Sequence, residues 1–393
     1  MQKQFKALLI GGPPHSGKST LAYRLSAALR AQKISHYLLR ANPDGEGNWF
    51  YESNDSIIQE LRKNNKKSWT QSFTKDITNF IAQTPAPLLV DTGGIPSEDT
   101  YKIAKVCQKA IIIAPNPALL HTWEDFIHEA QIQLLASFIS DLSGEQQVYV
   151  EKDTLYGIIH GLSKDMSSDG VCFSALTQQI KQEFEYSEIE MFAIHKSQIT
   201  DALVFQLNRM HMNASIWPDS DNWKPEELSI LLAALPSYEP LALYGVAPNW
   251  VYAAIAANTT LPLKIFTMQY GWVDIPLSEL PIRNLNGSGI TWTAHTALEK
   301  IYLQGNIHKD YLSLAEMTDL SVPNLPNNLG VILSGKLPQL VYAIAVRKYR
   351  KHLWVAVYQP QLNGSVVVFS QTSQHKIGDI ITVDNAYITN LSK

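Results

Sequence analysis

The chain has 393 residues, of which 45% are hydrophobic and 17% charged, and its formal net charge is 32 − 36 = −4. This length predicts two or three domains with a large core. The low charge argues against long disordered tails and against an overall basic field for nucleic acid. Two cysteines are too few for a zinc site or a disulfide scaffold, and no apolar run is long enough for a membrane span or a secretory signal. We therefore expect a cytoplasmic protein with no membrane partner.

The first half alternates short apolar runs with helical patterns. Strands are expected at 7–10, 36–40, 88–90, 110–114 and 147–150, a helix at 20–31, and a long amphipathic helix at 119–142. Strands that alternate with helices are typical of an α/β domain with a mainly parallel sheet. We assign this domain to residues 1–186.

A complete phosphate-loop motif follows the first predicted strand. Residues 12–19 read Gly-Pro-Pro-His-Ser-Gly-Lys-Ser and match G-x-x-x-x-G-K-[ST] in full. In this motif backbone N–H groups surround a phosphate, the lysine reaches the β- and γ-oxygens, and the serine hydroxyl binds Mg²⁺. The helix that follows directs its positive end at the anion. The sequence therefore predicts ATP and Mg²⁺ as cofactors, bound by Gly12, His15, Ser16, Gly17, Lys18, Ser19 and Thr20.

Three further residues are candidates for catalysis at this site. Asp91 ends a predicted strand and suits the carboxylate that organises the metal together with Ser19. Arg40 and Asp44 follow the second predicted strand, where an arginine can orient a phosphate and a carboxylate can act as a base. A simple turn is the competing interpretation of Asp44, because Asn-Pro-Asp-Gly is a common turn sequence. The domain resembles P-loop kinases and small ATPases, which leaves phosphoryl transfer and ATP hydrolysis both open.

The second half contains an internal repeat with an offset of 90 residues. Residues 245–253 (Gly-Val-Ala-Pro-Asn-Trp-Val-Tyr-Ala) and 335–343 (Gly-Lys-Leu-Pro-Gln-Leu-Val-Tyr-Ala) are identical at five of nine positions. Each copy follows an apolar strand and precedes a helix and another strand. Chance is the alternative explanation, because proline is favoured where a helix begins. We interpret the pattern as two tandem α+β units, 187–286 and 287–393.

The second copy carries the most specific family pattern in the chain. Residues 329–338 read Leu-Gly-Val-Ile-Leu-Ser-Gly-Lys-Leu-Pro, and the predicted helix after them ends in Arg-Lys-Tyr-Arg at 347–350. The runs Val-Ala-Val-Tyr-Gln-Pro at 355–360 and Gly-Asp-Ile-Ile at 378–381 follow. This pattern resembles the third family of CRISPR ring nucleases, small α+β proteins of type III systems. The resemblance implies that the region binds and opens cyclic tetra-adenylate, and some relatives are fused to a P-loop ATPase-like domain.

Local charge agrees with an anionic ligand for this region. Five Lys or Arg residues and no acid lie between 336 and 352, and the turn before the helix offers N–H groups for phosphate. A basic helix end is the competing interpretation, because cations there favour the helix dipole. Tyr349 can stack on a base. We therefore expect cyclic tetra-adenylate or another RNA-like ligand to contact Ser334, Gly335, Lys336, Pro338, Lys348, Tyr349, Arg350 and Gln359.

Two positions depart from the family pattern and concern catalysis. The family has a histidine where Arg350 lies here, and Gln359 replaces the aspartate of its Tyr-Asp-Pro. Ring opening by a 2′-hydroxyl needs a base, an acid or a metal, and arginine is a poor proton acceptor. Ring cleavage at the usual positions is therefore open, with Arg350 as its candidate catalytic residue and Mn²⁺ as an alternative metal.

Taken together, these patterns predict a type III CRISPR accessory protein. Its P-loop domain would hydrolyse ATP or transfer the phosphate, and its tandem units would bind and degrade cyclic tetra-adenylate. Two alternatives stay open: a kinase for a nucleoside, nucleotide or RNA 5′ end with Asp44 as base, and an ATP-gated sensor that holds the ring without cutting it. The small relatives act as dimers or larger assemblies, so we also expect a homo-oligomer, with the tandem copies as an internal pseudo-dimer.

Overall fold

The computed structural model describes residues 4–41, 71–142, 146–162, 170–208, 222–277, 289–308, 312 and 314–383. The chain forms two compact units, Met1–Gln198 and Ile199–Lys393. The boundary differs by one helix from the one expected after residue 186. Helix α7 (Glu188–Ser197) belongs to the first unit, because its buried His195 donates from Nε2 to the carbonyl oxygen of Pro85 at 2.8 Å. Within the described residues, no helix is long and apolar enough to cross a membrane.

The first unit is built on a seven-stranded sheet of order β2-β3-β1-β4-β5-β7-β6. Its strands are β1 (Ala7–Gly11), β2 (Tyr37–Ala41), β3 (Leu88–Thr92), β4 (Lys109–Ala114), β5 (Gln133–Asp141), β6 (Gln147–Glu151) and β7 (Thr154–His160). All neighbouring strands are parallel except β6, which pairs antiparallel with β7. The five strands expected from the sequence are confirmed at nearly the same bounds.

The predicted long helix at 119–142 is wrong over its second half. Helix α5 (Pro117–Glu129) ends early, and β5 follows it. Gln131 takes a left-handed backbone conformation (φ 59°), which ends the helix. The segment after it is a central parallel strand, buried on both faces over much of its length. Such a strand gives a continuous apolar run, which periodicity does not distinguish from a buried helix.

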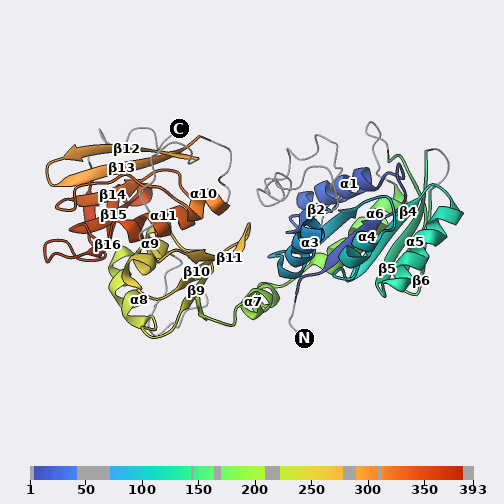
Figure 1. Ribbon diagram of the computed structural model, residues 1–393, viewed down its shortest axis with the longest axis horizontal. Coiled ribbons are helices and arrows are strands. Elements are labelled where there is room, and N and C mark those ends of the chain that lie inside the picture. The colour runs from blue at the N-terminus through green and yellow to red at the C-terminus, as the bar shows by residue number, and fades with distance from the viewer. Residues whose placement is uncertain are drawn as a thin grey trace. The chain divides into compact units, whose positions relative to one another are not determined.

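Helices cover both faces of this sheet (Figure 1). Helices α1 (Lys18–Ala31) and α6 (Val171–Phe184) pack on one face, and α3 (Gln71–Gln83), α4 (Glu98–Ala104) and α5 pack on the other. The carboxyl ends of the parallel strands therefore meet at one edge, where the phosphate-loop motif leads into α1. In open α/β sheets this is the edge at which ligands bind.

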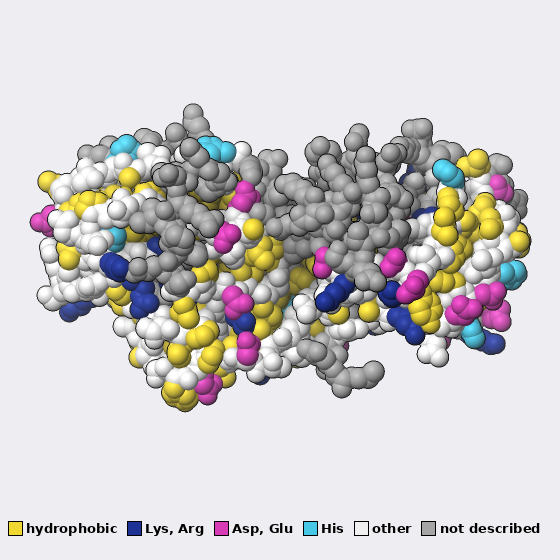
Figure 2. All heavy atoms as spheres, in the orientation of Figure 1, with side chains coloured by type: hydrophobic (Ala, Val, Ile, Leu, Met, Phe, Trp, Pro, Cys, Tyr) yellow, Lys and Arg dark blue, Asp and Glu magenta, His cyan; other side chains and the backbone are white. Residues whose placement is uncertain are grey.

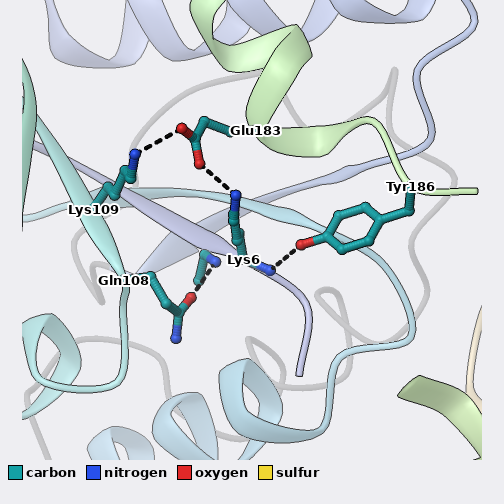
Figure 3. A network of polar contacts seen from close by, with 6 residues as sticks. Lys6, Gln108, Lys109, Glu183 and Tyr186 are labelled. Carbon is teal, nitrogen blue, oxygen red and sulfur yellow. Dashed lines mark hydrogen bonds and ion pairs between the residues drawn. The ribbon is translucent and has the colours of Figure 1, made fainter. Parts of the chain in front are cut away.

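A polar network fixes the opposite edge of the sheet (Figure 3). The Glu183 carboxylate of α6 accepts from Lys6 Nζ and Lys109 Nζ, each at 2.7 Å. The backbone N–H of Lys6 donates to the hydroxyl of Tyr186 at 3.1 Å. Burial raises the pKa of Glu183, but the bonds from Lys109 and Lys6 outweigh that effect and the pKa is lowered. The carboxylate therefore binds α6 to both the first and the fourth strand.

The described residues of the second unit form two sheets. The four-stranded sheet has the order β11-β10-β9-β8, and the six-stranded sheet runs from β12 to β17 in sequence order. Its strands are β8 (Leu203–Gln206), β9 (Leu241–Tyr244), β10 (Leu263–Thr267), β11 (Gly271–Ile275), β12 (Ile290–Ala297), β13 (Lys300–Ile307), β14 (Gly330–Ser334), β15 (Trp354–Gln359), β16 (Gly364–Ser370) and β17 (Ile380–Thr382). Its α-helices are α8 (Leu228–Ala234), α9 (Asn249–Asn258), α10 (Leu314–Thr318) and α11 (Gln339–Lys348).

The repeat seen in the sequence recurs as a repeated arrangement of elements. β8, β9 and β10 are parallel and β11 is antiparallel; β13, β14 and β15 are parallel and β16 is antiparallel. Tyr252 donates its hydroxyl to the Gly245 carbonyl at 2.5 Å, and Tyr342 donates to the Gly335 carbonyl at 2.8 Å. Helices α9 and α11 pack side by side in one shared core (Figure 1). The two copies therefore form a single compact unit.

Figure 2 shows how charged side chains are distributed on one face of the molecule. On the face drawn in Figure 2, Lys and Arg side chains of the described residues are interspersed with acidic and apolar ones, as the net charge of −4 implies. Sites for anions must therefore come from local geometry.

Candidate functional site

The phosphate-loop motif forms a tight loop between β1 and α1. Gly12 (φ 148°) and Gly17 (φ 88°) take conformations that favour glycine, and Gly17 directly precedes the helix. A Cβ on Gly12 would lie 1.9 Å from the carbonyl oxygen of Ile113, and one on Gly94 would lie 2.7 Å from the backbone nitrogen of Pro14. The loop is therefore held between the ends of β3 and β4, with its glycines required by close packing.

The structure brings three of the predicted residues together at the start of α1. Ser19 donates its hydroxyl to Asp91 Oδ2 at 2.8 Å. Arg40 Nε lies 3.4 Å from the same carboxylate oxygen, and Arg40 Nη2 lies 3.4 Å from Ser19 Oγ. This grouping follows from the strand order, because β3 lies between β1 and β2 and pairs Asp91 with both Ile10 and Arg40. Asp44 lies outside the described residues.

The site is electrostatically unusual because its charged groups are buried. Burial lowers the pKa of Lys18, against the charge of Asp91, and its Nζ donates to the Pro13 carbonyl at 2.7 Å. Burial also raises the pKa of Asp91, whereas the Ser19 bond and the charges of Arg40 and Lys18 lower it. Charged groups are seldom buried unless a partner compensates the lost hydration.

Ser16 Oγ and Asp91 Oδ1 are buried at this site and lack hydrogen-bond partners among the described residues. The described residues hold no cluster of three His, Cys, Asp or Glu side chains that could bind a metal by themselves. A divalent cation here would instead take Ser19 and Asp91 as ligands together with oxygens of a bound phosphate. The residues present thus fit a magnesium nucleotide.

The remaining predicted loop residues take supporting positions. His15 is exposed and has a left-handed backbone (φ 61°), so it contributes main-chain groups, and Thr20 lies within the first turn of α1. Sequence reasoning missed Leu162, whose side chain packs so closely that a Cβ on Gly17 would meet it at 3.0 Å. Arg24 also donates to the Gly161 carbonyl at 2.7 Å. These contacts span about 140 residues of sequence, and no motif signals them.

A second candidate site lies at the carboxyl ends of β14 and β15. Ser334 is buried at the end of β14, Gly335 (φ 132°) follows, and Lys336 is exposed. Pro338 caps the start of α11. Because β14 and β15 are parallel, Gln359 at the end of β15 lies at the same edge of the sheet. Five of the eight residues expected to bind the ring therefore lie together.

The other three residues lie at the far end of α11. This helix has ten residues, so at 1.5 Å per residue its ends are about 15 Å apart. Lys348, Tyr349 and Arg350 therefore do not join Lys336 in one patch, contrary to our expectation. The reason is the crossover itself: a helix between two parallel strands carries the chain back to the opposite edge.

The roles expected for these residues change accordingly. Tyr349 is buried, and its hydroxyl donates to the Pro323 carbonyl at 3.0 Å, so the ring is not available to stack on a base. The Arg350 guanidinium lies over the Phe369 ring, 5.9 Å from its centroid. Burial lowers the pKa of Lys348. Lys348 and Arg350 lie at the carboxyl end of α11, the position that the competing interpretation of a basic helix end expects for cations.

The two Gly-x-x-Pro loops meet at one edge of the second unit. Asn249 at the start of α9 donates from Nδ2 to the Leu337 carbonyl at 3.5 Å. Gln339 at the start of α11 donates from Nε2 to the Phe266 carbonyl at 3.3 Å. Asn249 and Gln339 are equivalent positions of the repeat, 90 residues apart. The starts of both helices, and the glycine turns before them, therefore form one continuous edge.

Comparisons with known proteins find a family match in the C-terminal part of the chain. Residues 306–382 match the family CRISPR-associated protein (Cas_csx3). The matched segment includes Ser334, Gly335, Lys336 and Gln359, which form the second candidate site. The chain is also 34% identical over 61 residues to an uncharacterized protein of Aquifex aeolicus (strain VF5), covering 16% of this chain and 55% of that protein. Residues 306–382 are thus similar to the Cas_csx3 family, which supports a CRISPR-associated protein.

Proposed function

We propose that this chain is a CRISPR accessory protein that binds ATP with Mg²⁺ in its N-terminal unit and cyclic tetra-adenylate in its C-terminal unit. The observation that carries the proposal is the Ser19–Asp91 bond of 2.8 Å beside a complete phosphate-loop motif, in a chain whose residues 306–382 match a CRISPR-associated family. Both units then bind adenine nucleotides through glycine turns at strand ends.

The residues of the N-terminal unit have distinct roles in this proposal. Lys18 exchanges the Pro13 carbonyl for phosphate oxygens, and the turns at Gly12 and Gly17 direct backbone N–H groups at the same anion. Ser19 and Asp91 hold Mg²⁺, which when bound screens the phosphate charge. Asp91 Oδ1 and Ser16 Oγ, buried and without partners among the described residues, gain partners when the site is filled.

The C-terminal unit supports binding of the ring more directly than its cleavage. Gly335 and Lys336 offer backbone N–H groups and one ammonium group to phosphate. Gln359 carries no titratable group, and Arg350 lies at the opposite end of α11. The two family positions associated with catalysis thus do not meet within one copy. We therefore propose binding as the primary function, with ring opening as a separate question for the assay.

Titration of the purified chain tests both binding functions. ATP with Mg²⁺ is expected to bind the wild type and to lose at least tenfold in affinity in Lys18→Ala, because the ammonium contacts two phosphates. The exposed Lys105 provides the matched control Lys105→Ala. Cyclic tetra-adenylate is expected to bind less tightly to Lys336→Ala than to Lys351→Ala, which removes a basic residue at the other end of α11. Absence of binding of either ligand to the wild type would overturn the corresponding half of the proposal.

Mass analysis of the products distinguishes the alternatives. Linear adenylates after incubation with Mg²⁺ or Mn²⁺ would establish ring opening, and dependence on ATP would link the two units. An intact ring recovered from a tight complex would identify a sensor. Transfer of labelled γ-phosphate to a nucleoside or an RNA 5′ end would identify the kinase.

A further inference from the structure

The two copies of the repeat differ in chemistry at the edge where their loops meet. Ile265 of β10 pairs with Leu243 of β9, and Val357 of β15 pairs with Leu333 of β14. Leu243 and Leu333 are equivalent positions of the repeat, 90 residues apart, so Ile265 is equivalent to Val357. By this register Phe266 corresponds to Tyr358. The same register makes Tyr244 correspond to Ser334, Trp272 to Ser365 and Val246 to Lys336. One half of the edge is therefore apolar and aromatic, and the other is polar and basic.

The apolar half is organised around three aromatic rings. The ring centroids of Tyr244 and Phe266 are 4.9 Å apart, and those of Phe266 and Trp272 are 5.2 Å apart. Val246, two residues after Tyr244, is 84% exposed, and Met268, two residues after Phe266, is 45% exposed. An apolar surface with aromatic support at the mouth of a turn fits the face of a nucleobase.

The polar half is adjacent to this apolar surface. Gln339 Nε2 lies 3.3 Å from the Phe266 carbonyl, so the loop of the second copy passes beside the strand end that leads to Met268. Lys336 is exposed in that loop, three residues before Gln339. A phosphate at Lys336 and a base at Val246 and Met268 can therefore belong to one nucleotide or to neighbours in one ring.

We propose that this edge binds an adenylate of the ring asymmetrically, with its phosphate at Gly335 and Lys336 and its purine base against Val246, Met268 and Trp272. This inference rests on the proposed binding of cyclic tetra-adenylate. In this arrangement the first copy of the repeat binds the base. The valine at position 246, where the second copy has Lys336, agrees with that role. A purine has the larger apolar face and gains more from such a surface than a pyrimidine.

Base-dependent binding tests the inference with two probes, cyclic tetra-adenylate and cyclic tetra-uridylate. The wild type is expected to prefer the adenylate ring. Val246→Ser and Met268→Ala should each weaken adenylate binding by about 5- to 20-fold while changing uridylate binding less. Lys336→Ala should weaken both rings by a similar factor and reduce the salt dependence. The control Leu298→Ala removes a side chain that is 94% exposed on the β12–β13 hairpin and should change neither affinity.

The possible outcomes separate the inference from the function on which it rests. A wild type that binds neither ring overturns the proposed function and the inference with it. Equal affinity for the two rings, or an unchanged preference in Val246→Ser and Met268→Ala, overturns the inference alone. A change of oligomeric state in these variants, with ring affinities unchanged, also overturns it and assigns the apolar half to contact between copies of the chain.

Discussion

Arg347 is one of the side chains that join the second copy of the repeat to the first. It lies near the end of α11, and its guanidinium donates to four backbone carbonyls of the first copy. These are Ala256 at 2.9 Å, Ile275 at 2.8 Å, Pro276 at 3.1 Å and Leu261 at 3.4 Å. Replacing Arg347 with methionine keeps an apolar stem of similar length and removes all four bonds. We therefore expect Arg347→Met to loosen the contact between the two copies.

The magnitude follows from the geometry of these bonds. All four are charge-assisted, and the two that are shorter than 3 Å contribute most, about 1.5 kcal/mol each or about 3 kcal/mol together. Burial opposes this gain, since it lowers the pKa of Arg347 to about 10, with a further effect from the charge of Arg350. The carbonyls left without a donor add a penalty when the arginine is removed. We expect a loss of about 2 to 4 kcal/mol in the free energy of unfolding of the second unit.

Urea unfolding with hydrogen exchange measured on peptides is the appropriate assay, because a chain with two compact units need not unfold in one step. Peptides from β11 and the end of α9 should lose protection in Arg347→Met. The matched control is Arg350→Met, since that guanidinium lies over the Phe369 ring and such a contact contributes about 0.5 to 1 kcal/mol. Equal losses in the two variants would refute the assignment of Arg347 as a link between the copies.

Three further substitutions test other parts of the description. Gly12→Ala should displace the phosphate loop, because the new Cβ would lie 1.9 Å from the Ile113 carbonyl oxygen, and titration should find ATP affinity reduced at least tenfold. Glu183→Gln should destabilise the first unit at pH 7. The pKa of this carboxyl is lowered from 4.5 in the folded protein. The stability that the carboxylate contributes is therefore present above pH 4.5 and is lost as the pH falls through the folded pKa. The difference from wild type in thermal unfolding should therefore shrink as the pH falls below 4.5 and vanish below the folded pKa of Glu183. Tyr349→Phe removes the bond to the Pro323 carbonyl and should cost about 1 kcal/mol of stability without changing ring affinity.

The phosphate-loop region was predictable because its information is local. The motif, the strand before it and the helix after it are contiguous in sequence, and the end of a parallel strand fixes the edge at which its last residue lies. Asp91 accordingly lies at the edge where the motif leads into α1, with its Oδ2 2.8 Å from Ser19 Oγ. Leu162 was not predictable, because its packing on Gly17 depends on the path of the chain after β7. The secondary-structure prediction was wrong around Gln131, because an apolar strand follows the helix there with no glycine or proline between them.

The basic run of the second copy shows a different limit of sequence reasoning. Residues close in sequence need not share a surface when a helix separates them. Lys336 and Lys348 are only twelve positions apart, but α11 directs them to opposite edges of the sheet. Conversely, Phe266 and Gln339 are 73 positions apart and are joined by a 3.3 Å bond. The repeat was readable from identical residues, whereas the contact between its copies depends on positions that differ, such as Asn249 and Gln339.

The contact between the copies also bears on how many chains surround one ring. A tandem chain presents both turns at one edge, but only the second turn carries a lysine, Lys336. Cyclic tetra-adenylate has four phosphates, so one chain places this ammonium at only one of them. For a single-stranded ligand each neutralised phosphate contributes a slope of about −0.7 to the dependence of log affinity on log salt concentration. If Lys336 alone sets that dependence, a single chain around the ring gives about −0.7 and two chains facing across it give about −1.4. The salt dependence of ring binding, measured for wild type and Lys336→Ala, therefore shows how many chains bind one ring. It distinguishes a single chain that binds the ring alone from two chains that associate around it.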